Sequence, residues 1–284
     1  MAVTNSTDLN DLLPSIVSEA LYVASERSIM RNLVRNFTLQ PGQGKTVTVP
    51  IYPKQTATAL TEATAGNQVT VATDGATLTV SEVGLYATVS DLALNASASN
   101  VVADFGRLFG EAIARKMDTD LMTNFRSFAT SINNTTTTLS AAMIFQAIAK
   151  LRSQGYDTSM DCSIVIHPNA AYDVLSAITN TFANPAGSYA NEAMAAGFMG
   201  TIGGVPVYQS SLVPIAQAGG AADDFTGAIF HRDAIGLAMM QDVRVETQRQ
   251  AAARGFDIVG SAIYGHGELY DLAGVQILAD STLS

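Results

Sequence analysis

The sequence predicts an α+β fold in which one long helix separates two regions of sheet. The stretch 100–128 carries apolar residues every three or four positions, the spacing of one helix face. Polar and apolar residues alternate at 46–51 and again at 243–247, which is typical of strands. Over 136–237 helical and strand-like segments take turns, and such alternation indicates a mixed α/β domain.

The long helix would be roughly 40 Å from end to end at about 1.5 Å per residue. Ser99 or Asn100 can cap its first turn, and Glu111 and Arg115 stand in the favourable order for an ion pair. Two interpretations are open: an ordinary core helix of one large domain, or a rigid strut that carries two separate sheet regions. Its apolar stripe consists of Val101, Phe105, Leu108, Phe109, Ala112, Ile113, Met117, Leu121 and Phe125.

The chain is poor in charge for a soluble monomer. Of its 284 residues 48% are hydrophobic and only 14% are charged, so small and neutral polar residues fill the surface. We interpret this as a chain that covers much of its surface with copies of itself; a monomer with a neutral surface is the alternative. The net charge of −10 argues against a nucleic-acid reader, and it is compatible with a surface that lies near DNA without adhering to it.

The N-terminal segment does not have the pattern of a targeting signal. It begins MAVTNSTDLNDLLPS, without the basic and apolar regions of a signal peptide, and no apolar run in the chain approaches a membrane span. A short helix is expected at 14–23. The single cysteine, Cys162, allows no disulfide framework, so synthesis in a reducing cytoplasm is expected.

Residues 41–90 are expected to form one long β-excursion. A turn rich in proline and glycine at 41–44 precedes the alternating strand 46–51. Small and polar residues fill 55–77, and strand character returns up to Asp91. An isolated two-stranded ribbon is marginally stable in water, so we expect something outside it, such as a neighbouring subunit, to cover it.

The second half of the chain alternates helices and strands before ending in strands. The expected elements are a polar connector at 131–140, a helix at 139–155, a buried strand at 162–166, a helix at 170–178, a loop at 179–200, a broken strand at 201–208, strands at 227–231, 243–247 and 258–264, a turn at Gly265 and Gly267, and a last strand at 275–278.

Two matches to catalytic motifs are weak. The sequence PGQGKT at 41–46 resembles a phosphate-binding loop, but a strand follows it where a helix N-terminus is needed. The triplet at 231–233, His-Arg-Asp, matches a kinase catalytic loop, but the chain has no glycine-rich loop and no Asp-Phe-Gly triplet. Both matches are interpreted as turns.

The sequence also predicts neither a metal site nor a catalytic nucleophile. His167, His231 and His266 stand without partners at metal-ligand spacing, and Cys162 lies at a buried strand with no evident base. No catalytic, cofactor-binding or metal-binding residue is therefore proposed, and we predict that the protein is not an enzyme.

Several segments, taken in order, resemble one known family. They are LPSIVSEALYVASERSIMRNLV, GKTVTVPIYPKQTATALTEATAG, SIVIHPNAAYDVLSA, MGTIGGVPVYQSSLVP and the closing IVGSAIYGHGELYDLAGVQIL. Together with the long helix they resemble the major capsid protein family of tailed bacteriophages, the Hong Kong 97-type shell fold. The resemblance implies an N-terminal arm at 1–40, an extended β-loop at 41–90, a peripheral domain with a spine helix at 91–135 and 238–284, and an α/β axial domain at 136–237.

The resemblance also implies a function. The chain would be a structural protein of the virion that assembles with itself into hexamers and pentamers of an icosahedral shell around double-stranded DNA. Portal and scaffolding proteins, a decoration protein and weakly held DNA would be its partners, with no membrane contact. Encapsulin-like compartments share the fold and are the first alternative; a monomeric α/β binding domain is the second. The intersubunit contacts expected are Leu12, Ile16 and Tyr22 on the arm and Ile51, Tyr52, Lys54 and Glu62 on the loop.

Overall fold

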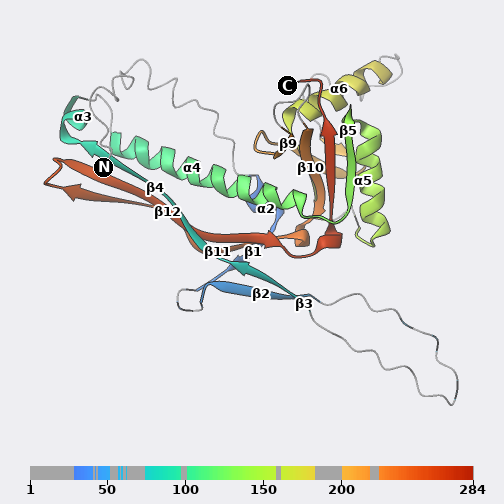
Figure 1. Ribbon diagram of the computed structural model, residues 1–284, viewed down its shortest axis with the longest axis horizontal. Helices are drawn as coiled ribbons and strands as arrows, with labels where there is room; N and C mark the ends of the chain where they lie inside the picture. The colour runs from blue at the N-terminus through green and yellow to red at the C-terminus, as the bar shows by residue number, and fades with distance from the viewer. Residues whose placement is uncertain are drawn as a thin grey trace.

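The computed structural model contains two sheets joined by the long helix (Figure 1). It gives the backbone alone at 74, 94–96, 101–107, 178–182 and 217. The residues it describes are 29–40, 42, 44–51, 57, 59, 62, 74–96, 101–157, 161–182, 200–217 and 224–283.

The first sheet has four strands in the order β1-β11-β12-β4 among the described residues. Its centre is a long antiparallel hairpin, β11 and β12, which is far longer than the two short alternating segments that the sequence indicated. The strand bounds are β1 Arg35–Thr38, β4 Ser81–Ser90, β11 Ile235–Gln250 and β12 Gly255–Glu268. Short helices flank this sheet: α2 Met30–Leu33 and α3 Asp91–Ala96.

The long helix is confirmed as α4, Val101–Thr123, and continues into one 3-10 turn, η2, Asn124–Arg126. It lies along one face of the four-stranded sheet and contacts β12, β11 and β4 (Figure 1). A two-stranded ribbon, β2 Thr46–Ile51 with β3 Asp74–Thr79, packs on the opposite face of the sheet.

The second sheet has, within the described ranges, seven strands in the order β5-β13-β10-β6-β8-β7, with β9 also paired to β10. Helices α5 Ala141–Ser153 and α6 Pro168–Phe182 pack on it. The strands are β5 Ser131–Thr138, β6 Cys162–Ile166, β7 Thr201–Ile202, β8 Val205–Gln209, β9 Ile215–Gln217, β10 Asp224–His231 and β13 Gly274–Asp280. Two 3-10 turns, η3 Arg232–Ala234 and η4 Asp271–Ala273, lead between the two sheets.

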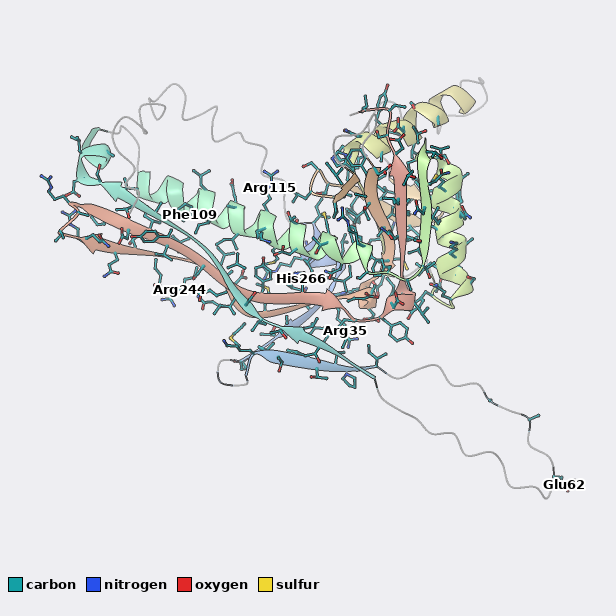
Figure 2. The ribbon with its side chains drawn as sticks, in the orientation of Figure 1. Arg35, Glu62, Phe109, Arg115, Arg244 and His266 are labelled. Carbon is teal, nitrogen blue, oxygen red and sulfur yellow. The ribbon has the colours of Figure 1, made fainter. Side chains whose placement is uncertain are left out.

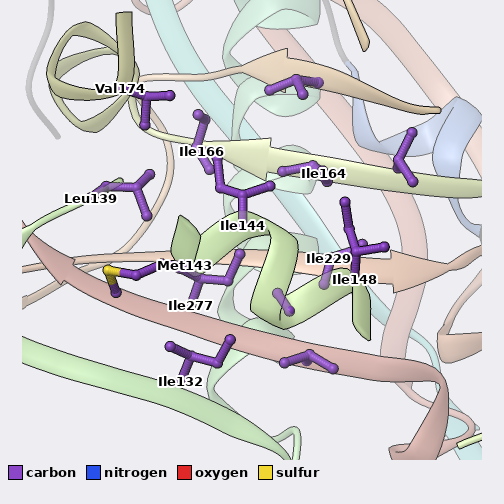
Figure 3. Close-up of a cluster of buried hydrophobic side chains, with 14 of the residues drawn as sticks. Ile132, Leu139, Met143, Ile144, Ile148, Ile164, Ile166, Val174, Ile229 and Ile277 are labelled. Carbon is purple, nitrogen blue, oxygen red and sulfur yellow. The ribbon is translucent and has the colours of Figure 1, made fainter. Parts of the chain in front are cut away.

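A buried cluster on one face of the second sheet explains why α5 forms where it does. Ser140 caps the helix by accepting a hydrogen bond from the Met143 amide. Residues three and four apart, such as Ile144, Ile148 and Leu151, then face the sheet and are at most 3% exposed (Figure 3).

The end of α4 fills the opposite face of the second sheet. One continuous core contains Leu121 of α4, Phe125 of η2, Phe230 of β10 and Tyr264 of β12. The helix is therefore both a core helix and a connection between the sheets, because its last turns pack on strands of both.

Two sequence expectations are wrong. Residues 131–138 form the strand β5 and not a polar connector; β-branched threonine favours strands, and only Ile132 faces the core, so no apolar alternation announces it. Gly265 and Gly267 lie within β12 and not in a turn.

The expected division of the chain into four segments stays a prediction, but two strands pair outside it. β13, which the sequence places with the peripheral segment, lies between β5 and β10 in the second sheet. β4, which the sequence places in the extended loop, is the edge of the first sheet beside β12. The arm helix expected at 14–23 lies outside the described residues.

Candidate assembly surfaces

The ribbon β2–β3 is built by the alternation seen in the sequence. Its strands pair antiparallel from Thr46 opposite Thr79 to Ile51 opposite Asp74. Along β2 the valines at 47 and 49 are half-buried and pack toward the four-stranded sheet, while Thr46 and Thr48 are exposed. One face of the ribbon therefore belongs to the fold and the other faces outward.

The ribbon packs on glycines of β12, where no side chain separates it from the four-stranded sheet. Leu78 of β3 is 1% exposed, and a Cβ at Gly267 would lie 2.9 Å from one of its methyl groups. A Cβ at Gly265 would lie 2.2 Å from the Thr79 carbonyl oxygen. Only glycine permits such an approach. The base of the ribbon is thus covered by its own chain, where the sequence suggested that a neighbour would be needed.

Polar groups between α4 and the four-stranded sheet bind one another. The Tyr264 hydroxyl donates to Asp120 Oδ2 at 2.8 Å, and Lys116 pairs with the same carboxylate. Burial, together with Asp120, raises the pKa of Tyr264 well above its ordinary value. The i,i+4 ion pair of the helix is therefore Lys116–Asp120; no Glu111–Arg115 pair occurs among the ion pairs of the described residues.

His266 lies in the same layer, beneath α4 (Figure 2). Asn124 Nδ2 is 3.0 Å from His266 Nδ1, which acts as acceptor when the ring is neutral. Burial lowers the pKa of His266; Lys116 lowers it further, while Asp120 raises it. These groups position the helix on the sheet.

The triplet 231–233 forms the turn η3 between the two sheets. His231 Nδ1 accepts from the Asp233 amide at 3.2 Å, and Arg35 pairs with Asp233 at 3.2 Å. Burial, with smaller contributions from Tyr270 and Asp233, raises the pKa of the nearby Tyr156 to about 12. These contacts close a turn.

A second junction contains two carboxyl groups. Glu268 ends β12, and Asp271, in η4, accepts from the Ala129 amide at 2.6 Å. Burial raises the pKa of Glu268; a hydrogen bond from Ser127 lowers it, and the neighbouring Asp271 raises it. The two carboxyl groups therefore connect the end of α4 to the crossing between the sheets.

The other candidate motifs also have structural roles. Gly44, at φ +94°, leads into strand β2 and not into a helix. Cys162 is buried, and burial is the main reason that its pKa rises to about 11, so the thiol stays protonated. Within the described part of the chain no group of three or more His, Cys, Asp or Glu residues is placed to hold a metal, and no helix is long and apolar enough to cross a membrane.

Comparison with known proteins identifies the family. A family model described as phage capsid protein matches residues 75–276. The chain belongs to this family. None of the curated proteins compared with it matches its sequence.

Solved capsids share the fold of this phage capsid protein, which is the Hong Kong 97-type shell fold. The capsid of cyanophage P-SCSP1u matches with a TM-score of 0.70 and 16% identity, over 89% of this chain and 88% of that one. The head of Helicobacter pylori bacteriophage KHP40 matches with a TM-score of 0.71 and 11% identity, over 87% and 88%. The native GTA particle capsid gives 0.67 and 14%, over 89% and 90%. The family match does not favour the encapsulin-like alternative.

The expected contact residues of the capsid protein are not brought together within one subunit. Ile51 is half-buried at the end of β2, opposite Asp74. Glu62 is exposed and lies far from both sheets (Figure 2). The remaining predicted contacts, Leu12, Ile16, Tyr22, Tyr52 and Lys54, lie outside the described residues.

Several exposed apolar side chains escaped the sequence reasoning. Leu92 is 67% exposed, Tyr86 54%, Phe145 53% and Tyr172 52%. Each lies in a helix or strand, where periodicity does not separate a residue that faces its own core from one that faces a partner. The exposure of an apolar side chain indicates a contact with a partner, and exposure can be read only from the three-dimensional structure.

Proposed function

We propose that this chain is the major capsid protein that forms the icosahedral shell of a tailed bacteriophage around its double-stranded DNA. The observation that carries the proposal is the family match over 75–276, which includes the long helix and most strands of both sheets. Hexamers and pentamers of the chain would tile the shell, and cooperative closure would multiply contacts that are individually modest.

The ribbon would act as the reaching element of each subunit. Leu78 packs against the glycines of β12 and fixes the base of the ribbon, so the direction of the ribbon is set before assembly. Contacts with a neighbour are proposed at Ile51, Tyr52, Lys54 and Glu62. The arm would add contacts at Leu12, Ile16 and Tyr22.

Other partners follow from the same proposal. Portal and scaffolding proteins, and a decoration protein, would bind the shell, which would be made in the host cytoplasm. The net charge of −10 would keep contact with packaged DNA weak, because like charges repel. The role is structural, and no enzymatic step is assigned.

The test is to express the full chain and examine it by sedimentation and electron microscopy. Closed shells of uniform size are expected. A stable species of 29.7 kDa that persists at high concentration would contradict the proposal. Expression with the neighbouring phage genes separates the two kinds of shell, because a phage shell takes up DNA and a compartment encloses protein.

The role of the extended loop between β2 and β3 is tested by deleting 55–75. The shortened chain should remain folded, because the anchored base at 46–51 and 76–79 stays in place, but it should not form shells. A control keeps the length and replaces the same residues with a flexible Gly/Ser segment, which should also fail. Shells of normal yield from both variants would refute the role of the extended loop in assembly.

A further inference from the structure

The strands at the two ends of the seven-stranded sheet contain no charged residue. One end is β5, Ser131–Thr138, which we call the β5 flank; the other is the β7–β8 hairpin, 201–209, which we call the hairpin flank. The sequence has no charged residue from 127 to 149 and none from 193 to 222. In a chain with a net charge of −10, these are the places where identical copies approach with the least repulsion.

The β5 flank is an open edge. Among the described residues β5 pairs only with β13, in parallel, and its other side has no strand. Edge strands are commonly protected by charged side chains or proline, and β5 has neither. Asn133 and Thr135 are exposed on it, and threonine favours strand pairing. This edge is a template for pairing with another chain.

The hairpin flank is different in kind. Its turn is formed by Gly203 and Gly204, at φ +61° and +87°, and Pro206 removes one backbone donor from β8. Phe145 of α5 lies beside the turn: a Cβ at Gly203 would be 3.4 Å from its Cε1 atom. The ring is 53% exposed, so this flank presents an apolar group next to a neutral hairpin.

Two cations of α5 bind backbone carbonyl groups at the borders of the flanks. Lys150 Nζ donates to the Ser131 carbonyl oxygen at 2.9 Å, at the start of the β5 flank. Arg152 donates to the Gly203 carbonyl oxygen at 3.5 Å, at the hairpin flank. Both side chains come from the last turns of α5, so each binds the backbone at the border of one flank.

We propose that the β5 flank of one copy docks on the hairpin flank of the next copy. The inference rests on the proposed function, which supplies a second copy as the occupant. Because the flanks are unlike and lie at opposite ends of one sheet, the contact is head-to-tail, and repetition of such a contact closes a ring when the rotation between copies divides a full turn. Main-chain groups of the β5 edge supply hydrogen bonds, and Phe145 supplies apolar contact.

The direct test places charge on the β5 flank without changing its size. The double variant Asn133→Asp with Thr135→Asp should remain folded, since both side chains are exposed. Shell yield should fall at least about tenfold, because the contact would bury two carboxylates against a neutral surface that offers them no partner. The matched control, Asn133→Ser with Thr135→Asn, adds no charge and should assemble like the wild type. Normal shells from the charged variant would overturn the inference.

A mixing experiment tests the head-to-tail arrangement. Phe145→Asp damages only the hairpin flank, and the double Asp variant damages only the β5 flank. Mixed together they should form heterodimers through their two intact flanks but no rings, as measured by native mass spectrometry. If β5 pairs with β5 of another copy, the Phe145→Asp variant alone forms dimers and the mixture adds none, which overturns the head-to-tail contact.

Hydrogen exchange gives a measurement that needs no variant. Amides of 131–138 and 201–209 should gain protection when wild-type subunits assemble, and unchanged exchange there would reject the contact. Wild-type chains that never assemble would overturn the proposed function and this inference with it. Shells that form with both flanks still exchanging freely would overturn the inference alone.

Discussion

Replacing Phe125 with alanine tests whether one core holds both sheets. Phe125 follows α4 directly, is 0% exposed, and its ring centroid lies 5.5 Å from that of Phe230 in β10. The same core contains Leu121 of α4 and Tyr264 of β12. Removing this ring opens a cavity at the place where the helix, the four-stranded sheet and the seven-stranded sheet meet.

The expected loss is about 3–5 kcal/mol in the free energy of unfolding, the usual cost of truncating a fully buried phenylalanine. That is a large part of a typical total of about 5–15 kcal/mol. Phe109→Ala is the matched control, because Phe109 lies on the same helix but is only half-buried, against Gly260. Its truncation should cost less than about half as much, since less apolar area is lost from burial.

Urea unfolding followed by circular dichroism gives the size of the loss, at one protein concentration and with the oligomeric state checked by sedimentation. Hydrogen exchange then shows where the loss is felt. Protection should fall in β6 and β10 as well as in β11 and β12, because both sheets share the core. A decrease confined to β11 and β12, or a loss below about 1 kcal/mol, would refute the shared core.

Four further changes follow from the geometry. Gly265→Ala should cost about 1–3 kcal/mol and speed proteolysis within the ribbon, because the new methyl group meets a backbone oxygen of β3; unchanged cleavage would contradict the anchoring. Folding lowers the pKa of His266, so its contribution to stability is present above pH 6.5 and is lost as pH falls; His266→Gln should remove that loss in urea titrations across pH 5–8. Folding raises the pKa of Glu268, so its contribution to stability is present below pH 4.5 and is lost as pH rises. Glu268→Gln should remove this decrease in the free energy of unfolding with rising pH, an effect opposite in sign to that of His266→Gln. The same pH dependence of stability in both variants would contradict the assignment. Thr282→Val removes the hydroxyl that binds the buried Asp173 carboxylate and should lower the free energy of unfolding, measured by urea titration, by about 1–3 kcal/mol; Thr282→Ser should restore it.

Local periodicity was enough for the elements that have a strong period of their own. The buried strand Cys162–Ile166 was predicted at its bounds, whereas the helix predicted over 100–128 begins at Val101 and ends at Thr123, before the turn η2. Both could be predicted because each buries a regular set of apolar side chains. β5 was missed because seven of its eight residues are polar and only Ile132 turns inward. An edge strand needs one apolar face at most, so its sequence resembles a loop.

The local sequence pattern does not determine which sheet a strand joins. β13 alternates as expected, but nothing within 274–280 says whether it pairs with β10 or with the peripheral strands. The pairing is decided by the core around it, where Val275 and Ile277 meet residues of α5 and β6. The glycines of β12 were misinterpreted for a related reason: their role is to admit β3, whose Leu78 and Thr79 lie nearly 190 positions earlier in the chain.

The placement of charge distinguishes the parts of the molecule that hold their own shape from those that meet a neighbour. Arg31 pairs with Asp242 and Arg249 with Asp91, so peripheral cations fasten short elements to the long hairpin. Such exposed pairs are worth at most about 1 kcal/mol each and weaken in salt. The flanks at 131–138 and 201–209 contain no charged residue of their own. Contacts made there lose little when salt is added, whereas the repulsion between copies with a net charge of −10 becomes weaker, so assembly should be favoured by added salt.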